Sequence, residues 1–192
     1  MAEQARTTLR EDRDATMHTS PGARLAAGIV SGLIGGILMI GLMIGYAQMT
    51  GAGLTTPLKA LGGFVYGLEA LVVGPEAILA GALIQVGMAI VLGILFALFM
   101  SRATSTLAAM CAGIVVAVVI WAAMDLIVLP YENPTMAARI TLEPFAYFVA
   151  HILLGLGLGM TPAFIRAFSR ERRHNSESRD RAHPSAAQTQ SI

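Results

Sequence analysis

The stretch LAAGIVSGLIGGILMIGLMIGYAQM, residues 25–49, decides the fold because it is long, apolar and free of charged side chains. A helix rises about 1.5 Å per residue, so a stretch of this length can cross the hydrocarbon core of a membrane, which is about 30 Å thick. Three more stretches have the same character, at residues 78–100, 107–129 and 145–165. We therefore predict an all-α membrane protein with four transmembrane helices.

The composition supports a membrane protein. Of the 192 residues, 55% are hydrophobic and only 13% are charged, which lies outside the usual range of soluble domains. Helices are expected because lipid cannot satisfy exposed backbone groups, and no stretch shows the alternation of a membrane strand. We expect a polar cytoplasmic tail at residues 1–23, a four-helix transmembrane domain at residues 24–168, and a disordered cytoplasmic tail at residues 169–192.

The basic residues predict the orientation. Only Lys59 and Arg139 lie in the loops that follow the first and third spans, whereas the others lie in or next to the two tails or at Arg102 in the middle loop. Basic residues are enriched on the cytoplasmic side of membrane proteins. We therefore expect a multi-pass protein of a bacterial inner (cytoplasmic) membrane with both termini in the cytoplasm.

The two outward loops are expected to contain short helices that lie in the membrane interface. In residues 57–75 the apolar side chains recur at spacings of three and four, which gives a helix one apolar face. Residues 130–144 form a shorter version between prolines. The apolar face of the first loop comprises Leu58, Leu61, Val65, Leu68 and Val72.

The order of spans and loops suggests a tandem duplication of a helical hairpin. Each half contains a span, an outward loop with a short helix, and a second span. Chance similarity between apolar sequences is the other interpretation. Aligning the second spans pairs Gln85 with His151, Ala89 with Gly155 and Gly93 with Gly159, and the first spans share Gly-Ile-Val at Gly28 and Gly113.

Glycines at four-residue spacing predict helix packing faces. Gly28, Gly32 and Gly36 follow this spacing in the first span, and Gly155 and Gly159 follow it in the last. Small residues let two helix backbones approach closely inside lipid. The partner of the first span is another span of the chain, which we favour, or a second copy in a homo-oligomer.

Three strongly polar side chains lie well inside the spans, at Gln85, Asp125 and His151. Counted from the helix ends, all three fall at a similar depth near the outer surface, on three different helices. Polar groups in a membrane usually face the bundle interior. Two interpretations stay open: a hydrogen-bonded cluster that fixes the helix register, or a binding or proton-relay site.

Charged residues of the outward loops form a predicted outer rim above this cluster. A solvated surface is the simpler interpretation, and a mouth that attracts cations is the alternative. The rim comprises Glu69, Glu76, Glu132, Arg139 and Glu143.

Neither a metal nor another cofactor is expected, and no catalytic residue is assigned. One histidine and one carboxylate supply only two ligands, and Cys111 is placed toward the opposite side of the membrane. The methionines invite a copper interpretation, although methionine is an ordinary gap-filler in apolar helices. No nucleotide loop, catalytic triad or redox cysteine pair is present.

The chain resembles a loose group of small prokaryotic four-span membrane proteins of unknown function. The resemblance is carried by the glycine-rich first span, by Pro130 closing the third, and by the step from His151 to Gly155. Gln85 stands where that group often has a second histidine. The resemblance implies the four-span fold and no activity.

We therefore expect a non-enzymatic structural or accessory component whose partners are the lipid bilayer and another membrane protein or a second copy, with no nucleic acid. A small permease or proton-coupled carrier that uses Asp125, His151 and Gln85 is the alternative. Haem or copper binding is a lesser one.

Overall fold

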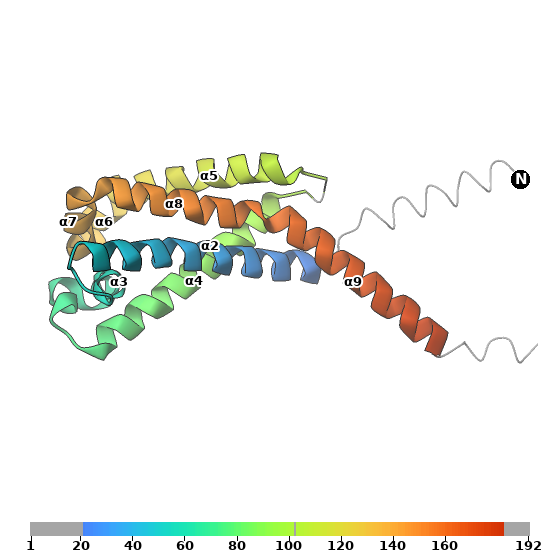
Figure 1. The fold of residues 1–192 in the computed structure, drawn as a ribbon, viewed down its shortest axis with the longest axis horizontal. Coiled ribbons are helices and arrows are strands. Elements are labelled where there is room, and N and C mark those ends of the chain that lie inside the picture. Colours follow the sequence, from blue (N-terminus) through green and yellow to red (C-terminus); the bar gives the residue numbers. More distant parts are fainter. Residues whose placement is uncertain (1–20, 102, 183–192) are drawn as a thin grey trace, which may run out of the picture.

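The computed structural model describes residues 21–101 and 103–182, and all regular structure in these two segments is helical (Figure 1). Four helices are long and apolar enough to cross a membrane, which confirms the predicted all-α fold and the number of spans. They are α2 (Pro21–Met49), α4 (Pro75–Phe99), α5 with its extensions (Thr106–Glu132), and α8 running into α9 (Pro144–Glu171).

Short helices gather at one end of the bundle, which we call the loop end. They are α3 (Thr56–Tyr66), the 3-10 helix η1 (Gly67–Leu71) and α7 (Pro134–Leu142). The opposite end, where α2 begins and α9 (Thr161–Ala182) leaves the bundle, is called the tail end (Figure 1).

Proline and capping residues explain where helices begin. Proline lies in the first turn of α3, α4, α7 and α8, where its missing N–H group leaves no intrahelical bond unmade. The side chain of Ser105 accepts a hydrogen bond from the Ala108 N–H at the start of α5 (Thr106–Ala123) over 3.2 Å.

The third span is not a regular helix. After α5 it passes through a π-helical turn, η2 (Met124–Val128), into α6 (Leu129–Glu132), and the Leu129 N–H bonds the Met124 carbonyl oxygen. Pro130 cannot donate the hydrogen bond that an α-helix would need at this point. The wider turn therefore accommodates the proline and rotates the residues around it.

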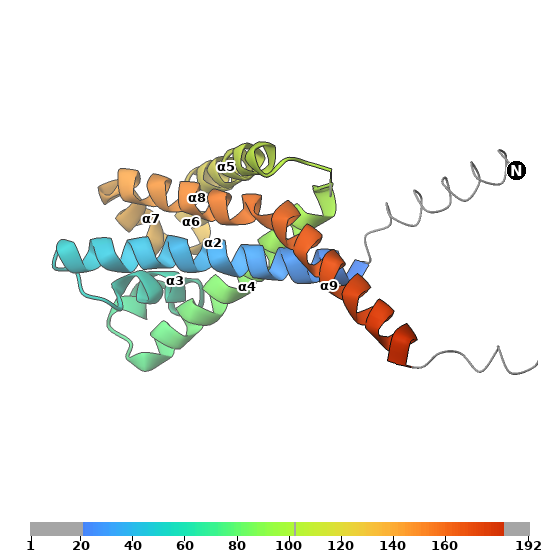
Figure 2. The same cartoon turned by 45° about the vertical axis from the view of Figure 1, so that its right-hand side comes forward.

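The four long helices lie in the order α4, α2, α8, α5 (Figures 1 and 2). Close backbone contacts hold them: a Cβ on Gly32 would lie 2.9 Å from the Gly93 Cα of α4, and one on Gly157 of α8 would lie 2.5 Å from the Gly35 nitrogen. The other predicted packing glycines also lie at contacts, with Gly28 and Gly36 against α4 and with Gly155 and Gly159 of α8 (Pro144–Gly159) against α5. Although consecutive in the sequence, α4 and α5 make little or no close backbone contact with each other.

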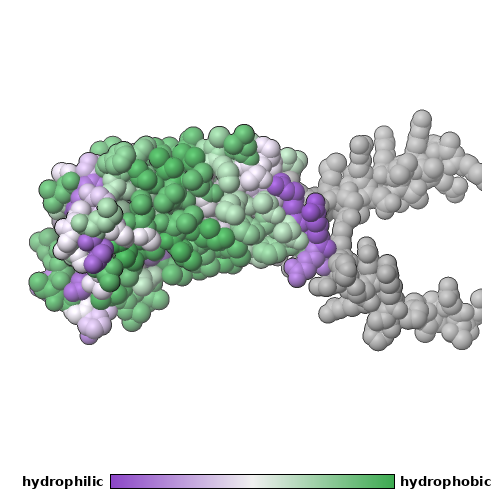
Figure 3. Space-filling view, in the orientation of Figure 1, coloured by the Kyte–Doolittle hydropathy of each residue, from purple (hydrophilic) through white to green (hydrophobic). Residues whose placement is uncertain are grey.

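The face of the bundle seen in Figure 3 is mostly apolar, with polar side chains gathered toward the two ends. Exposed apolar side chains of the long helices include Ile37, Leu83 and Val119. Large apolar side chains on the outside of a bundle are what contact with lipid requires.

The C-terminal segment differs from its expectation. Residues 169–182, expected to be disordered, continue α9 as a helix, and arginine and glutamate in this segment are good helix formers. Of the polar tail predicted at residues 1–23, residues 21–23 form the start of α2, and residues 1–20 lie outside the described part, as do the last residues, 183–192.

Candidate functional site

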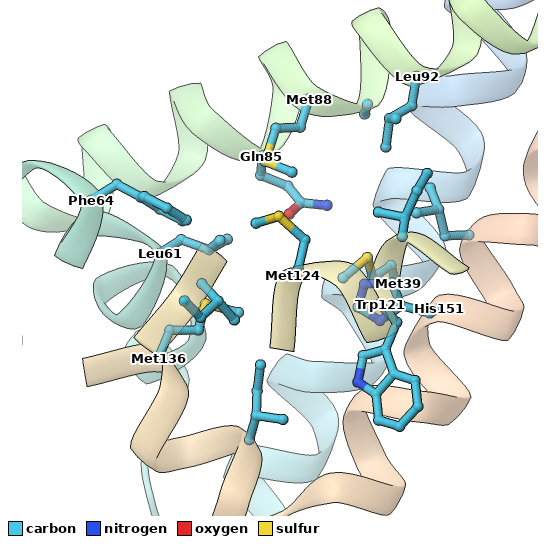
Figure 4. A pocket seen from close by; sticks show the side chains of 15 residues that line it. Met39, Leu61, Phe64, Gln85, Met88, Leu92, Trp121, Met124, Met136 and His151 are labelled. Carbon is cyan, nitrogen blue, oxygen red and sulfur yellow. The ribbon is translucent and has the colours of Figure 1, made fainter. Parts of the chain in front are cut away.

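The candidate site is a cavity between α4 and α5, beneath the short helices of the loop end (Figure 4). The space open to the centres of water molecules is about 50 Å³. One water needs roughly 10–15 Å³ on the same measure, so the cavity can hold a few waters or a small organic group. Its walls are mostly apolar: Met39, Leu61, Phe64, Gln85, Met88, Ala89, Leu92, Ile120, Trp121, Met124, Leu129, Met136, Ile140, His151 and Leu154.

His151 enters the cavity from α8 and is only 8% exposed (Figure 4). Its Nδ1 atom lies 2.8 Å from the Tyr147 carbonyl oxygen. A carbonyl oxygen can only accept, so Nδ1 carries the hydrogen and donates it. In the neutral ring the Nε2 atom is then left as a hydrogen-bond acceptor.

Gln85 enters the cavity from α4, opposite the helix that carries His151. Its Nε2 atom donates a hydrogen bond to the Gly36 carbonyl oxygen of α2 over 3.1 Å. One amide group therefore joins two helices and also lines the cavity. Its oxygen atom stays able to accept a further hydrogen bond.

Asp125 is placed differently from the other two predicted cluster residues. It lies in the π-helical turn and is half-buried, and it does not line the cavity, although the preceding Met124 does. Within the described segments, no hydrogen bond or ion pair joins Asp125 to His151 or Gln85. The structure thus brings Gln85 and His151 to one cavity and leaves Asp125 outside it.

Trp121 is a cavity residue that the sequence analysis missed. Its ring packs edge-to-face on Phe148, with the ring centroids 5.3 Å apart. Its Nε1 atom is buried and finds no hydrogen-bond partner in the part of the chain that the structure describes. The single tryptophan of the chain, four residues before Asp125 in an apolar span, was the signal available in the sequence.

Asn133 is a second missed residue, and it joins the two loops at the loop end. Its side chain is fully buried and donates from Nδ2 to the Ala60 carbonyl oxygen of α3 over 2.9 Å. Its Oδ1 accepts from the Met136 N–H over 3.0 Å, which caps α7. The pair Asn133–Pro134 is a typical helix start and could have been read from the sequence.

The residues of the predicted outer rim all lie at the loop end. Arg139 and Glu143, one turn apart, form an ion pair of 3.3 Å, and both side chains are largely buried. The remaining rim residues, Glu69, Glu76 and Glu132, are exposed.

Polar contacts at the tail end were also missed. The hydroxyl oxygens of Ser31 on α2 and Thr161 on α9 lie 2.7 Å apart, and both residues are fully buried. Arg166 of α9 donates to the Thr104 carbonyl oxygen over 3.2 Å and to the Thr106 hydroxyl over 2.7 Å. These bonds attach α9 to α2 and to the start of α5.

Metal ligands of the usual kind are not grouped in the described segments: no three histidine, cysteine, aspartate or glutamate side chains come together there. Cys111 is exposed on α5. The cavity does bring together sulfur atoms of several methionines, among them Met39, Met88 and Met124.

Comparison with protein-family models, with curated proteins and with solved structures finds no match to this chain.

Proposed function

We propose that this chain is a non-enzymatic structural or accessory component of a membrane. The observation that carries the proposal is the use of polar side chains inside the spans, because they bond neighbouring helices. Gln85 donates to the backbone of α2, and Ser31 meets Thr161 across the α2–α9 contact. Polar groups used in this way stabilise helix association in lipid.

An accessory role requires a surface for a helix of another membrane protein, and we place it on the loop-end half of α2. Gly41 and Gly45 are exposed there, and a Cβ on either would meet nothing within 4 Å. Gly28, Gly32, Gly35 and Gly36 of α2 are already covered by α4 or α8. Gly41 and Gly45 are four residues apart and lie on the same helix face as the exposed Ile37. Their uncovered backbone forms a surface on which a second helix can pack closely.

Extraction in mild detergent, affinity purification of the full chain and quantitative mass spectrometry test this proposal. Gly45→Leu is expected to lose a membrane protein that the unaltered chain retains near stoichiometrically, because the larger side chain covers the bare backbone. Gly87→Leu is the matched control, since Gly87 of α4 is equally exposed and equally free of neighbours. Recovery of the chain alone, or equal loss from both variants, would contradict the accessory role.

We place both termini in the cytoplasm of a bacterial inner membrane, with the short helices in the outer interface. Two observations support this orientation. Lys59 and Arg139 are the basic residues of the described loop end, whereas Arg24, Arg166 and Arg170 lie toward the tail end. In the loop after α2, the apolar Val65, Leu68 and Val72 are exposed, as expected for side chains that reach into lipid.

We also infer a tandem duplication of a helical hairpin. Gly32 contacts Ala89 and Gly93 in the first hairpin, and Gly113 contacts Gly155 and Gly159 in the second. The sequence alignment pairs the same residues of the second spans. The interhelical contacts therefore match Gly113 with Gly32. The sequence alignment matched Gly113 with Gly28, which lies one helical turn earlier.

A small permease or proton-coupled carrier is the second candidate, and the cavity lined by His151 and Gln85 favours it. A carrier needs water to reach these residues from outside the membrane. In a Cys111→Ser background, Gln85→Cys should then react with a membrane-impermeant maleimide added outside. Absence of labelling would count against transport through this cavity.

Haem or copper binding is the lesser alternative. Methionine sulfur and imidazole nitrogen are ligands that suit Cu(I), and the cavity contains both. Elemental analysis and an absorption spectrum of protein purified in mild detergent test it, and a colourless, copper-free preparation would contradict it.

A further inference from the structure

We propose that the cavity binds a neutral, mostly apolar alcohol that enters from the bilayer, with its hydroxyl bonded to His151. This inference is independent of the accessory role, because it concerns the cavity between α4 and α5 and no contact with another protein.

The polar atoms of the cavity suit a hydroxyl group. His151 contributes an Nε2 acceptor, because its Nδ1 is occupied by the Tyr147 carbonyl oxygen. A hydroxyl can donate a hydrogen bond to this imidazole nitrogen. Gln85 offers a further acceptor from α4.

The rest of the cavity suits an uncharged, apolar chain. No lysine, arginine, aspartate or glutamate lines it, and a buried charge without a partner is strongly disfavoured. Pockets with mostly apolar walls and a few placed polar groups are typical of small-molecule sites. Several lining residues are methionines, whose flexible side chains adapt to differently shaped ligands.

The bilayer is the source that the geometry supports. The cavity lies between α4 and α5, whose backbones make little or no close contact with each other. Met88, at its edge, is 36% exposed, and the neighbouring surface carries exposed apolar side chains such as Val91 and Val119. A molecule dissolved in the hydrocarbon region can therefore reach the cavity from the side.

Fluorescence of Trp121, the single tryptophan of the chain, reports binding directly. The full chain in lipid nanodiscs is titrated with 6-bromo-1-hexanol and, as the matched control, with 1-bromohexane, since bromine quenches indole fluorescence on contact. We expect saturable quenching by the alcohol at a membrane concentration about ten-fold lower than any quenching by the alkane, because a hydrogen bond to His151 is gained. Equal quenching by both, rising in proportion to concentration, would overturn the proposal and would leave only partitioning into lipid.

Variants separate the polar contact from a general loss of fold. His151→Leu is expected to weaken alcohol binding about ten-fold, whereas His151→Gln, which keeps an acceptor near the Nε2 position, recovers most of the affinity. Val115→Leu, on the exposed side of α5 and away from the cavity wall, is expected to bind as the unaltered chain does. Unchanged binding in His151→Leu would overturn the assignment of His151. If His151→Leu does not elute as a folded protein on gel filtration, the comparison of the alcohol and alkane titrations of the unaltered chain still tests the proposal.

Discussion

The side-chain amide of Gln85 on α4 donates a hydrogen bond to the Gly36 carbonyl oxygen on α2 over 3.1 Å. This bond lies one turn from the contact between Gly32 and Gly93, where the two backbones approach most closely. The polar and the glycine contacts therefore stabilise the same helix pair, and Gln85 also forms part of the cavity wall.

Replacing Gln85 with leucine is expected to lower the free energy of unfolding by about 1 kcal/mol, because an interhelical hydrogen bond in a membrane contributes about that much. Reversible unfolding in mixed detergent micelles measures the change. Gln48→Leu, an exposed position near the end of α2, is the control and should change stability by less than about 0.5 kcal/mol. Equal effects of the two variants would contradict a stabilising role for the Gln85 bond.

Adding a methyl group to α2 is expected to have opposite consequences at two glycines. Gly32→Ala should destabilise the protein by about 1–3 kcal/mol, because the new Cβ would press on the backbone of α4. Gly41→Ala should leave stability nearly unchanged, since its Cβ would meet nothing within 4 Å. The same unfolding assay compares them, and a neutral Gly32→Ala would mean that α2 and α4 are not in close contact.

Loss of the Asn133 side chain is expected to cost about 1–3 kcal/mol, because the Ala60 carbonyl oxygen and the Met136 N–H would both lose a buried partner. Asn133→Asp retains the cap on α7 and loses the donor to α3. Its free energy of unfolding should therefore lie between those of Asn133→Ala and the unaltered chain. Hydrogen exchange of the α3 and α7 amides locates the effect. Protection that is unchanged in the alanine variant would show that Asn133 does not join the two loops.

Double-mutant cycles distinguish the two kinds of polar residue in the spans. Ser31→Ala and Thr161→Val are expected to be coupled by 0.5 kcal/mol or more, in line with roughly 0.5–3 kcal/mol for residues in contact, because their hydroxyls lie 2.7 Å apart. The effects of Asp125→Asn and His151→Ala on the free energy of unfolding should be additive within about 0.5 kcal/mol, since no hydrogen bond joins the two residues in the described segments. Strong coupling of the second pair would return Asp125 to the cavity cluster.

The four spans could be predicted from the sequence because lipid imposes a minimum length and excludes charge, and both conditions can be read directly from residues such as 25–49. Depth in the membrane could also be counted from the helix ends. The direction of a side chain around the helix axis could not. The π-helical turn before Pro130 changes that direction, and Asp125 consequently lies outside the cavity that its neighbours Trp121 and Met124 line.

The glycine spacing predicts a packing face but not its partner. Gly32 and Gly35 belong to one helix, yet the first contacts α4 and the second contacts α8. Only the three-dimensional arrangement separates these two faces from the uncovered one at Gly41 and Gly45. The cavity was likewise inaccessible to sequence reasoning, because its walls come from helices and loops distributed over most of the chain.

Cross-linking in the native membrane tests the accessory role most directly. A photo-reactive amino acid is introduced at position 45 and, as the control, at position 87, where the surrounding space is equally open. Position 45 is expected to yield a discrete adduct with one other membrane protein, and position 87 only lipid adducts. Lipid adducts alone at both positions would contradict the proposal that α2 packs against a helix of a partner.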